Sequence, residues 1–188
     1  MIIFNIYDYK IFLETNQAPK YYREFFRDDS LLAEEIDIDR TEKDPLDSNV
    51  VFIAAKNCGS KKEFSLTLLL GYSPSDPAFY PELLYVPESQ ILFIRAGEKI
   101  LAYQLQVPQK LFELSVDIGF LSWERYSNYI IMVAEMRMTV WNLAGEQLWT
   151  LFVEQPWSYH CHHEMMSFIK DEQVYTFPVA TGPGKERM

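Results

Sequence analysis

A chain of 188 residues has the length of a single domain, and 48% apolar residues exclude a chain that is disordered throughout. The formal net charge of −10 disfavours nucleic-acid binding, because a phosphate backbone must be neutralised by cations. No apolar run approaches the ~18 residues of a membrane span, and the first residues lack the basic and apolar regions of a signal peptide. We therefore expect one soluble, cytoplasmic domain over residues 1–188, with neither nucleic acid nor membrane as its partner.

The segment 20–47 differs from the rest of the chain. After Pro19, six apolar side chains recur mostly every three or four residues, which predicts a helix: Tyr21, Tyr22, Phe25, Phe26, Leu32 and Ile36. Residues 28–47 hold nine acidic and two basic side chains, so −7 of the net charge lies in them. Two interpretations stay open for this helical, acidic insertion. It is either a solvated surface segment, or a docking surface that offers a basic partner Glu34, Glu35, Asp37 and Asp39.

From residue 49 onward the pattern changes to short apolar runs separated by turns. Residues 50–55 and 64–70 are two such runs around a polar loop with Gly59, which predicts two strands. Aromatic side chains, 15% of the chain, also favour a pleated, half-buried surface. The body of the protein is therefore expected to be β, and residues 2–13 are expected to supply a strand that pairs with the last one.

Two units of similar pattern repeat in the middle of the chain, over 83–120 and 121–158. A shift of 38 positions without a gap places 91–94 on 129–132, 101–105 on 139–143 and 110–114 on 148–152. Each unit alternates three apolar runs with turns, which is the pattern and about the length of a propeller blade. Residues 51–70 and 165–177 indicate two further, partial units.

The second unit resembles a known family. Trp141-Asn142, a turn at Gly145 and the apolar run that follows resemble the end of a WD40-type blade, where that family has Trp-Asp. The chain lacks the family's upstream Gly-His pair and the Asp that ties a blade into a hydrogen-bonded network. The resemblance covers about residues 83–155 and implies an antiparallel meander of propeller-like blades, in an incomplete or very small propeller or a curled sheet. Open edges of such an arc would recruit a partner.

All three histidines lie within residues 160–164. In an extended strand His160, His162 and Glu164 share one face, and two imidazoles with a carboxylate could hold zinc. The alternative is a polar turn between two units. Cys161 would point to the other face, away from these histidines, so a Cys–His pair is not expected. The sequence contains neither a glycine-rich phosphate loop nor a G-x-S-x-G elbow, and no catalytic residue is assigned.

Large aromatic residues crowd the second unit and the segment after it. Most are expected in the core, and any exposed cluster is a candidate partner surface, formed by Trp123, Arg125, Tyr126 and Trp157.

The sequence thus predicts a mainly β chain with a short N-terminal helical, acidic segment. The expected function is a non-catalytic protein–protein interaction module that binds another protein or itself and needs no cofactor. Its sharpest version is an acidic inhibitor or immunity-type protein that neutralises a basic partner. Two alternatives stay open: a small zinc-dependent enzyme built on residues 160–164, and a binder of small ligands that uses the aromatic surface.

Overall fold

The computed structural model of the chain describes residues 1–38, 50–59, 63–71, 81–97, 99–115 and 119–184. Contacts divide the chain into two compact units, Met1–Ser115 and Val116–Met188. Nearly all of the regular structure is β, as expected, in four open sheets whose neighbouring strands are mostly antiparallel. Within the described ranges, no helix has the length and apolar character required to cross a membrane.

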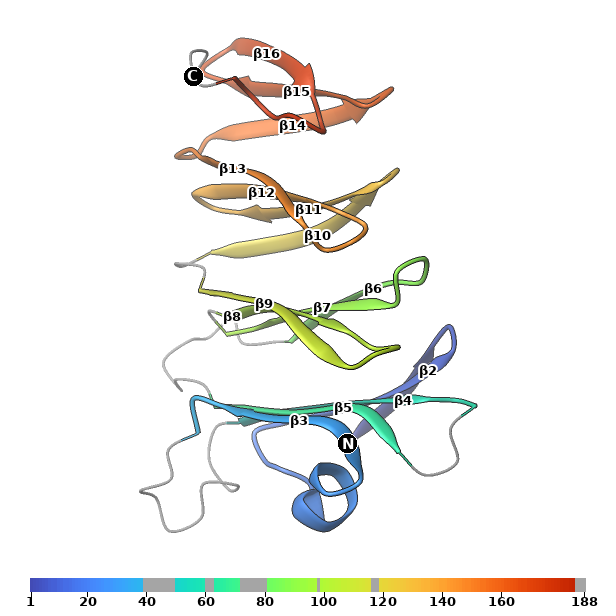
Figure 1. Ribbon diagram of the computed structural model, residues 1–188. Coiled ribbons are helices and arrows are strands. Elements are labelled where there is room, and N and C mark those ends of the chain that lie inside the picture. The colour runs from blue at the N-terminus through green and yellow to red at the C-terminus, as the bar shows by residue number, and fades with distance from the viewer. Residues whose placement is uncertain (39–49, 60–62, 72–80, 98, 116–118, 185–188) are drawn as a thin grey trace. The chain divides into compact units, whose positions relative to one another are not determined.

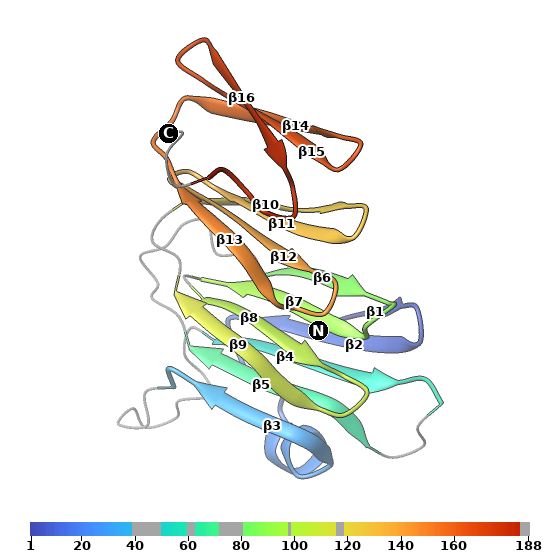
Figure 2. The ribbon, with the colours of Figure 1, turned by 45° about the horizontal axis from the view of Figure 1, so that its top comes forward.

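The first unit begins with a five-stranded sheet (Figure 1), in which the strands follow one another in the order β1-β2-β4-β5-β3 (Figure 2). Its strands are β1 (Ile2–Ile6), β2 (Tyr9–Thr15), β3 (Ser30–Ile36), β4 (Val50–Asn57) and β5 (Phe64–Gly71). Only β3 and β5 are parallel. The expectation that residues 2–13 pair with the last strand is wrong, because β1 and β2 form a hairpin around Tyr7-Asp8. A two-residue connection closes at a much smaller entropic cost than one that spans the chain.

A four-stranded antiparallel meander packs on this sheet within the same unit (Figure 2). It consists of β6 (Glu82–Val86), β7 (Ile91–Ala96), β8 (Lys99–Gln104) and β9 (Gln109–Ser115). β4 is buried on both faces, because successive side chains of a strand point to opposite sides. Val51 and Ile53 join the core shared with the meander, while Val50 and Phe52 pack with Tyr22 on the other face.

The helix expected over residues 20–36 is confined to the π-helix η1 (Tyr22–Arg27), which lies on the face of the five-stranded sheet opposite the meander (Figure 1). Residues 30–36 are strand β3 instead. Leu32 and Ile36 pack against the shared core, whereas Leu31 is 59% exposed. A spacing of four fits a helix and a strand alike, since a strand repeats every second residue. Parallel pairing with β5 decides for the strand.

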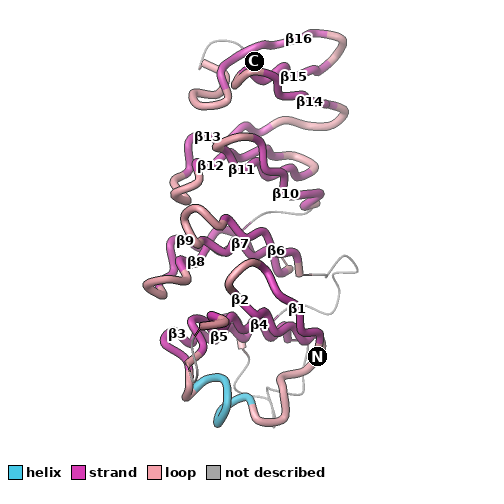
Figure 3. Tube along the Cα trace, turned by 90° about the vertical axis from the view of Figure 1, so that its right-hand side faces the viewer, coloured by secondary structure: helices cyan, strands magenta, loops and turns pink. Residues whose placement is uncertain are grey.

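The second unit has two sheets around one core (Figure 3). One is a four-stranded meander of β10 (Phe120–Tyr126), β11 (Tyr129–Ala134), β12 (Arg137–Asn142) and β13 (Gln147–Phe152). The other has three strands, β14 (Trp157–His162), β15 (Met165–Lys170) and β16 (Gln173–Pro178). The core takes side chains from both sheets, among them Ile131, Val140 and Phe168. The two four-stranded meanders span 82–115 and 120–152, where the sequence repeat indicates units at 83–120 and 121–158.

Candidate partner-binding site

The three-stranded sheet differs from both meanders by one strand. In each meander a fourth strand, β9 or β13, pairs with the third. In the last sheet the third strand, β16, pairs with β15 on one side only, as far as the structure describes the chain. The outer side of β16 is therefore an unpaired sheet edge, a position from which proteins recruit further strands.

The register of the β15–β16 hairpin shows which backbone groups point outward. Asp171 and Glu172 have φ values of 49° and 64°, as both central residues of a type I′ turn require. In such a hairpin the flanking pair, Lys170 and Gln173, exchanges backbone hydrogen bonds, and every second pair after it does too. Val174 and Thr176 fall between these pairs, so their N–H and C=O groups point away from β15.

Residues 179–184, the described residues after β16, do not cover this edge. The amides of Thr181 and Gly182 turn back to donate hydrogen bonds to the carbonyl of Pro178, at 3.2 and 3.0 Å. Trp149 fixes the turn, because its indole N–H donates to the Val179 carbonyl at 2.6 Å. Gly182 adopts φ +66°, and a Cβ there would lie 2.6 Å from the Trp149 ring. The described residues that follow β16 thus pack on β13 and do not pair with β16.

Side chains along the β16 edge are apolar or neutral, and acidic groups lie at both ends. Val174 is 62% exposed, while Phe177 is buried in the core. Asp171 and Glu172 are exposed in the turn that precedes β16. At the other end Glu164 is exposed, and its carbonyl accepts the Val179 amide at 2.8 Å. The edge therefore suits an extended segment with an apolar middle and basic ends.

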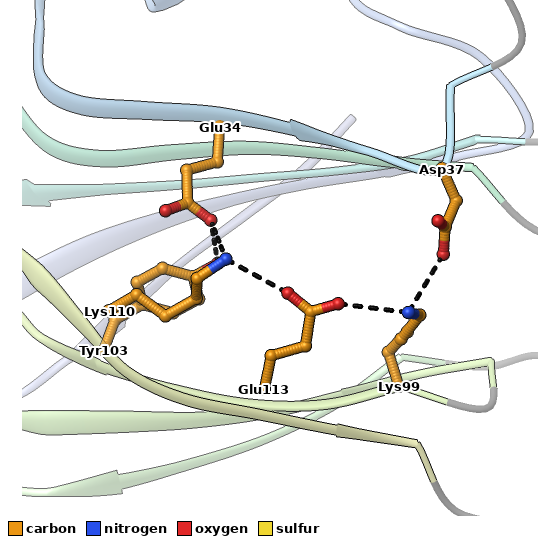
Figure 4. Close-up of polar contacts among 6 residues, drawn as sticks. All are labelled: Glu34, Asp37, Lys99, Tyr103, Lys110 and Glu113. Carbon is orange, nitrogen blue, oxygen red and sulfur yellow. Dashed lines mark hydrogen bonds and ion pairs between the residues drawn. The ribbon is translucent and has the colours of Figure 1, made fainter.

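Three of the four acidic residues singled out in the sequence, Glu34, Glu35 and Asp37, are engaged inside the first unit, and Figure 4 shows the contacts of Glu34 and Asp37. Glu34 accepts a hydrogen bond from the Tyr103 hydroxyl at 2.9 Å and pairs with the Lys110 ammonium at 2.9 Å. Asp37 lies 3.3 Å from the Lys99 ammonium. Glu35 accepts a hydrogen bond from the Tyr22 hydroxyl at 3.3 Å and lies 3.5 Å from Arg27. Asp39 lies outside the described residues.

Glu113 joins the two lysines of this network. Its carboxylate oxygens lie 3.0 Å from the ammonium groups of Lys99 and of Lys110. Burial by itself raises the pKa of Glu113, but hydrogen bonds from both lysines outweigh it, and the pKa falls below its ordinary value. The pKa of Lys99 is raised, first by its hydrogen bond to Glu113. Burial, followed by the charge of Glu34, raises the pKa of Tyr103. The network ties β3 to β8 and β9, so residues 30–36 of the segment 20–47 form a strand held by contacts within the unit and are not the solvated surface segment of the first interpretation.

The histidine cluster does not lie on one extended strand. His160 and His162 are exposed on β14, but the strand ends at His162, and Glu164 lies in the turn with φ 62°. The expected common face of three ligands therefore lacks its carboxylate. Across the described ranges no group of three or more His, Cys, Asp or Glu side chains is placed to hold a metal ion. Burial, followed by the charge of Glu124, raises the pKa of the Cys161 thiol to about 11.

The aromatic candidates of the second unit are mostly covered. Trp123 packs between Phe120 and Trp141, with ring centroids at 5.6 and 5.7 Å. Trp157 stacks on Phe168 at 5.4 Å. Tyr126 packs against the core of the unit, and Arg125 alone of the four candidates is exposed. Trp123, Tyr126 and Trp157 therefore contribute to packing within the second unit, and the four candidates do not form one exposed surface.

Sequence reasoning missed Val174 and Thr176. The signal that pointed to them was the partial unit at 165–177, which is shorter than the units at 83–120 and 121–158. It belongs to the sheet of β14, β15 and β16, which has one strand fewer than each meander. An unpaired edge depends on what the rest of the chain does, which no local pattern reveals.

Comparisons with known proteins add little to this description. No family model and no curated protein matches the chain. Similar solved structures include Kluyveromyces lactis Hsv2, with 9% identity over 56% of this chain and 35% of that one and a TM-score of 0.31. Another is Kluyvelomyces marxianus Hsv2, with 10% identity over 52% and 34% and a TM-score of 0.29. Hsv2 is a β-propeller protein. The chain spans about a third of the length of these structures, and the fold assignment rests on the strand pairings alone.

Proposed function

We propose that this chain is a non-catalytic protein-interaction module that binds an extended, basic segment of another protein as a fourth strand beside β16. The observation that carries the proposal is that no described strand pairs with the outer edge of β16, in a sheet one strand shorter than the two meanders. Strand addition is a general mode of peptide recognition, in which main-chain hydrogen bonds supply affinity and side chains supply specificity.

The backbone of β16 supports this mode directly. Val174 and Thr176 both direct an N–H and a C=O group outward, so an added strand would form up to four main-chain hydrogen bonds with them. Pro178 ends the edge, because it has no N–H to donate. The segment recognised is therefore short, about the length of β16 itself.

Charge supports a basic partner. The described residues 119–184 contain seven acidic and three basic side chains, a net charge of −4. Glu164 and Asp171, near the two ends of a six-residue strand, lie about 20 Å apart at ~3.4 Å per residue. Two basic residues about six positions apart on the added strand would reach both. This arrangement suits an acidic inhibitor or immunity-type protein that covers a basic partner.

The probe for the test is a fluorescent ten-residue peptide of alternating Thr and Val with lysines six positions apart, and binding is measured by fluorescence anisotropy. We expect it to bind more tightly than the same peptide with glutamates in place of the lysines, and to weaken as salt is added. Val174→Pro removes one outward N–H and should weaken binding by about tenfold, since a lost hydrogen bond costs ~1 kcal/mol or more. Glu164→Gln with Asp171→Asn should weaken it by about two- to fivefold.

Val174→Thr is the matched control, because it keeps the N–H and the β propensity and should bind the peptide as the native chain does. Both variants should have the same thermal unfolding midpoint as the native chain. An unchanged midpoint in Val174→Pro would show that the proline does not disturb the hairpin. Equal binding by Val174→Pro would overturn strand addition, and preference for the glutamate peptide would overturn the basic partner. Light scattering that shows a dimer, lost in Val174→Pro, would assign the edge to a second copy of the chain and overturn the heterologous partner.

A further inference from the structure

A cavity of about 440 Å³ lies on the η1 side of the five-stranded sheet, entirely within the first unit. Its size is within the range of small-molecule sites, about 300–1,000 Å³. The residues that line it include Phe12, Phe26 and Phe64, together with Lys20, Lys56 and Asp29. None of them belongs to the β16 edge, so the cavity is independent of the proposed function.

Three phenylalanine rings from different elements form the apolar wall of the cavity. Phe12 comes from β2, Phe26 from η1 and Phe64 from the start of β5. Their ring centroids are 5.9 Å (Phe12–Phe26), 5.5 Å (Phe12–Phe64) and 5.0 Å (Phe26–Phe64) apart. Aromatic rings held in this way by one another give a preformed apolar surface. Such a surface favours the hydrocarbon or aromatic part of a ligand.

Two lysines give the cavity a positive charge that is unusual for so acidic a chain. The ammonium of Lys56 lies 5.2 Å from the centre of the Phe64 ring, and that of Lys20 lies 5.5 Å from the Tyr21 ring. In the part of the chain that the structure describes, neither lysine forms an ion pair with a carboxylate. Asp29, which is exposed, is the one acidic residue among the described residues that line the cavity. Met1 lines the cavity too, but its N-terminal ammonium is paired with Glu14 at 2.9 Å. Apart from that ion pair, the two lysines and Asp29 leave a surplus of one positive charge among the described lining residues.

We propose that this cavity binds an amphiphile with a single negative charge, such as a medium-chain fatty acid. The hydrocarbon chain packs on Phe12, Phe26 and Phe64, and the carboxylate lies near the ammonium groups of Lys20 and Lys56. A single charge matches the surplus, whereas the second charge of a dianion would meet Asp29. A neutral amphiphile would leave the lysines without a partner, and a cationic one would be repelled by them.

The experiment measures, by calorimetry, the affinities of decanoate, decan-1-ol and decylammonium for the full chain. Each compound is used below the concentration at which it aggregates. We expect decanoate to bind most tightly and decylammonium least. Lys20→Gln with Lys56→Gln should reduce decanoate affinity by about tenfold and leave decanol unchanged, because only the charged contact is lost. Both lysines lie at the surface of the unit, and thermal unfolding checks that the variant keeps the native fold.

Lys170→Gln in the second unit is the control for a change in net charge, and it should leave decanoate affinity unchanged. Equal affinity for decanoate and decylammonium would overturn the proposal, as would unchanged decanoate binding in the double variant. Absence of decanoate binding to the native chain would overturn it too, without any effect on the β16 edge, whose peptide assay uses residues of the other unit.

Discussion

The hydroxyl of Tyr103 on β8 donates a 2.9 Å hydrogen bond to the carboxylate of Glu34 on β3, so two strands from different sheets of the first unit are joined by one polar contact. The Tyr103 side chain is fully buried in the core between those sheets. The Lys110 ammonium lies 2.9 Å from the same carboxylate oxygen and balances its charge. Glu34, which the sequence offers as a contact for a basic partner, thus connects two sheets within the protein.

This tie predicts non-additive effects on stability. Glu34→Ala leaves the buried Tyr103 hydroxyl without its acceptor and should lower the free energy of unfolding by about 1–3 kcal/mol. Tyr103→Phe removes the donor as well, so the double variant should be less destabilised than the two single variants together, by about 1 kcal/mol. Urea unfolding of the native chain and the three variants measures the coupling. Strictly additive losses would show that the hydrogen bond contributes nothing to stability.

The Glu113 carboxylate predicts a loss of stability in acid. Its pKa in the folded protein lies below its ordinary value of 4.5, because Lys99 and Lys110 hydrogen-bond to it. The unfolded chain therefore takes up a proton first as the pH falls, and the stabilisation present above about pH 4.5 is lost as the pH drops through the folded pKa. Unfolding free energies measured from pH 6 downward should fall less steeply below about pH 4.5 in Glu113→Gln.

Lys99→Met serves as the second variant for this prediction. It removes one of the two ammonium groups and should move the acid limb of the native chain part of the way toward that of Glu113→Gln. Identical acid limbs in all three proteins would place the titrating groups elsewhere.

We expect that position 182 does not accept a side chain without a loss of stability. It has φ +66°, which disfavours any residue with a Cβ, and an added Cβ would lie 2.6 Å from Trp149. Gly182→Ala should destabilise the protein by about 1–2 kcal/mol and shift the Trp149 fluorescence, because the indole must move. Gly184→Ala is the matched control, since no atom of the described residues lies within 4 Å of a Cβ there. If Gly182→Ala were as stable as the native chain, the turn at residue 182 would be able to move away from Trp149 without a cost in free energy, which would contradict this prediction.

The two cysteines are predicted to differ in reactivity. Cys58 is exposed, whereas Cys161 is half-buried and its pKa is raised to about 11 by burial and by Glu124. Because the thiolate is the reactive form, Cys161 should react with iodoacetamide at pH 8 at least tenfold more slowly than Cys58, with roughly 1% or less of it ionised. Alkylation rates of Cys58→Ser and Cys161→Ser measure the two thiols separately. A fast reaction in Cys58→Ser would contradict the burial of Cys161.

Local patterns in the sequence identified the class of fold. Short apolar runs between turns, rich in aromatic residues, predict strands, and the antiparallel meanders confirm them. The repeat over 83–158 indicates two units of similar strand pattern, and the pattern at 165–177 indicates a shorter unit. In the structure the last sheet has three strands, where each meander has four. These features follow from the sequence because two strands joined by a tight turn pair with each other through residues that are close in the chain.

The sequence by itself therefore determined that this chain is mainly β, where most of its apolar runs and turns lie after residue 49, and how its charge is distributed. Only the tertiary structure decided that residues 30–36 form a strand. A spacing of four residues fits the period of a helix and that of a strand, and parallel pairing with β5 stabilises the strand. The tertiary structure also decided that Glu34 and Asp37 meet lysines of other strands, and that Glu164 lies in a turn beyond the strand that holds His160 and His162. Among the described residues, it left the outer edge of β16 unpaired. Each of these depends on contacts between residues far apart in the chain, which a linear pattern does not specify.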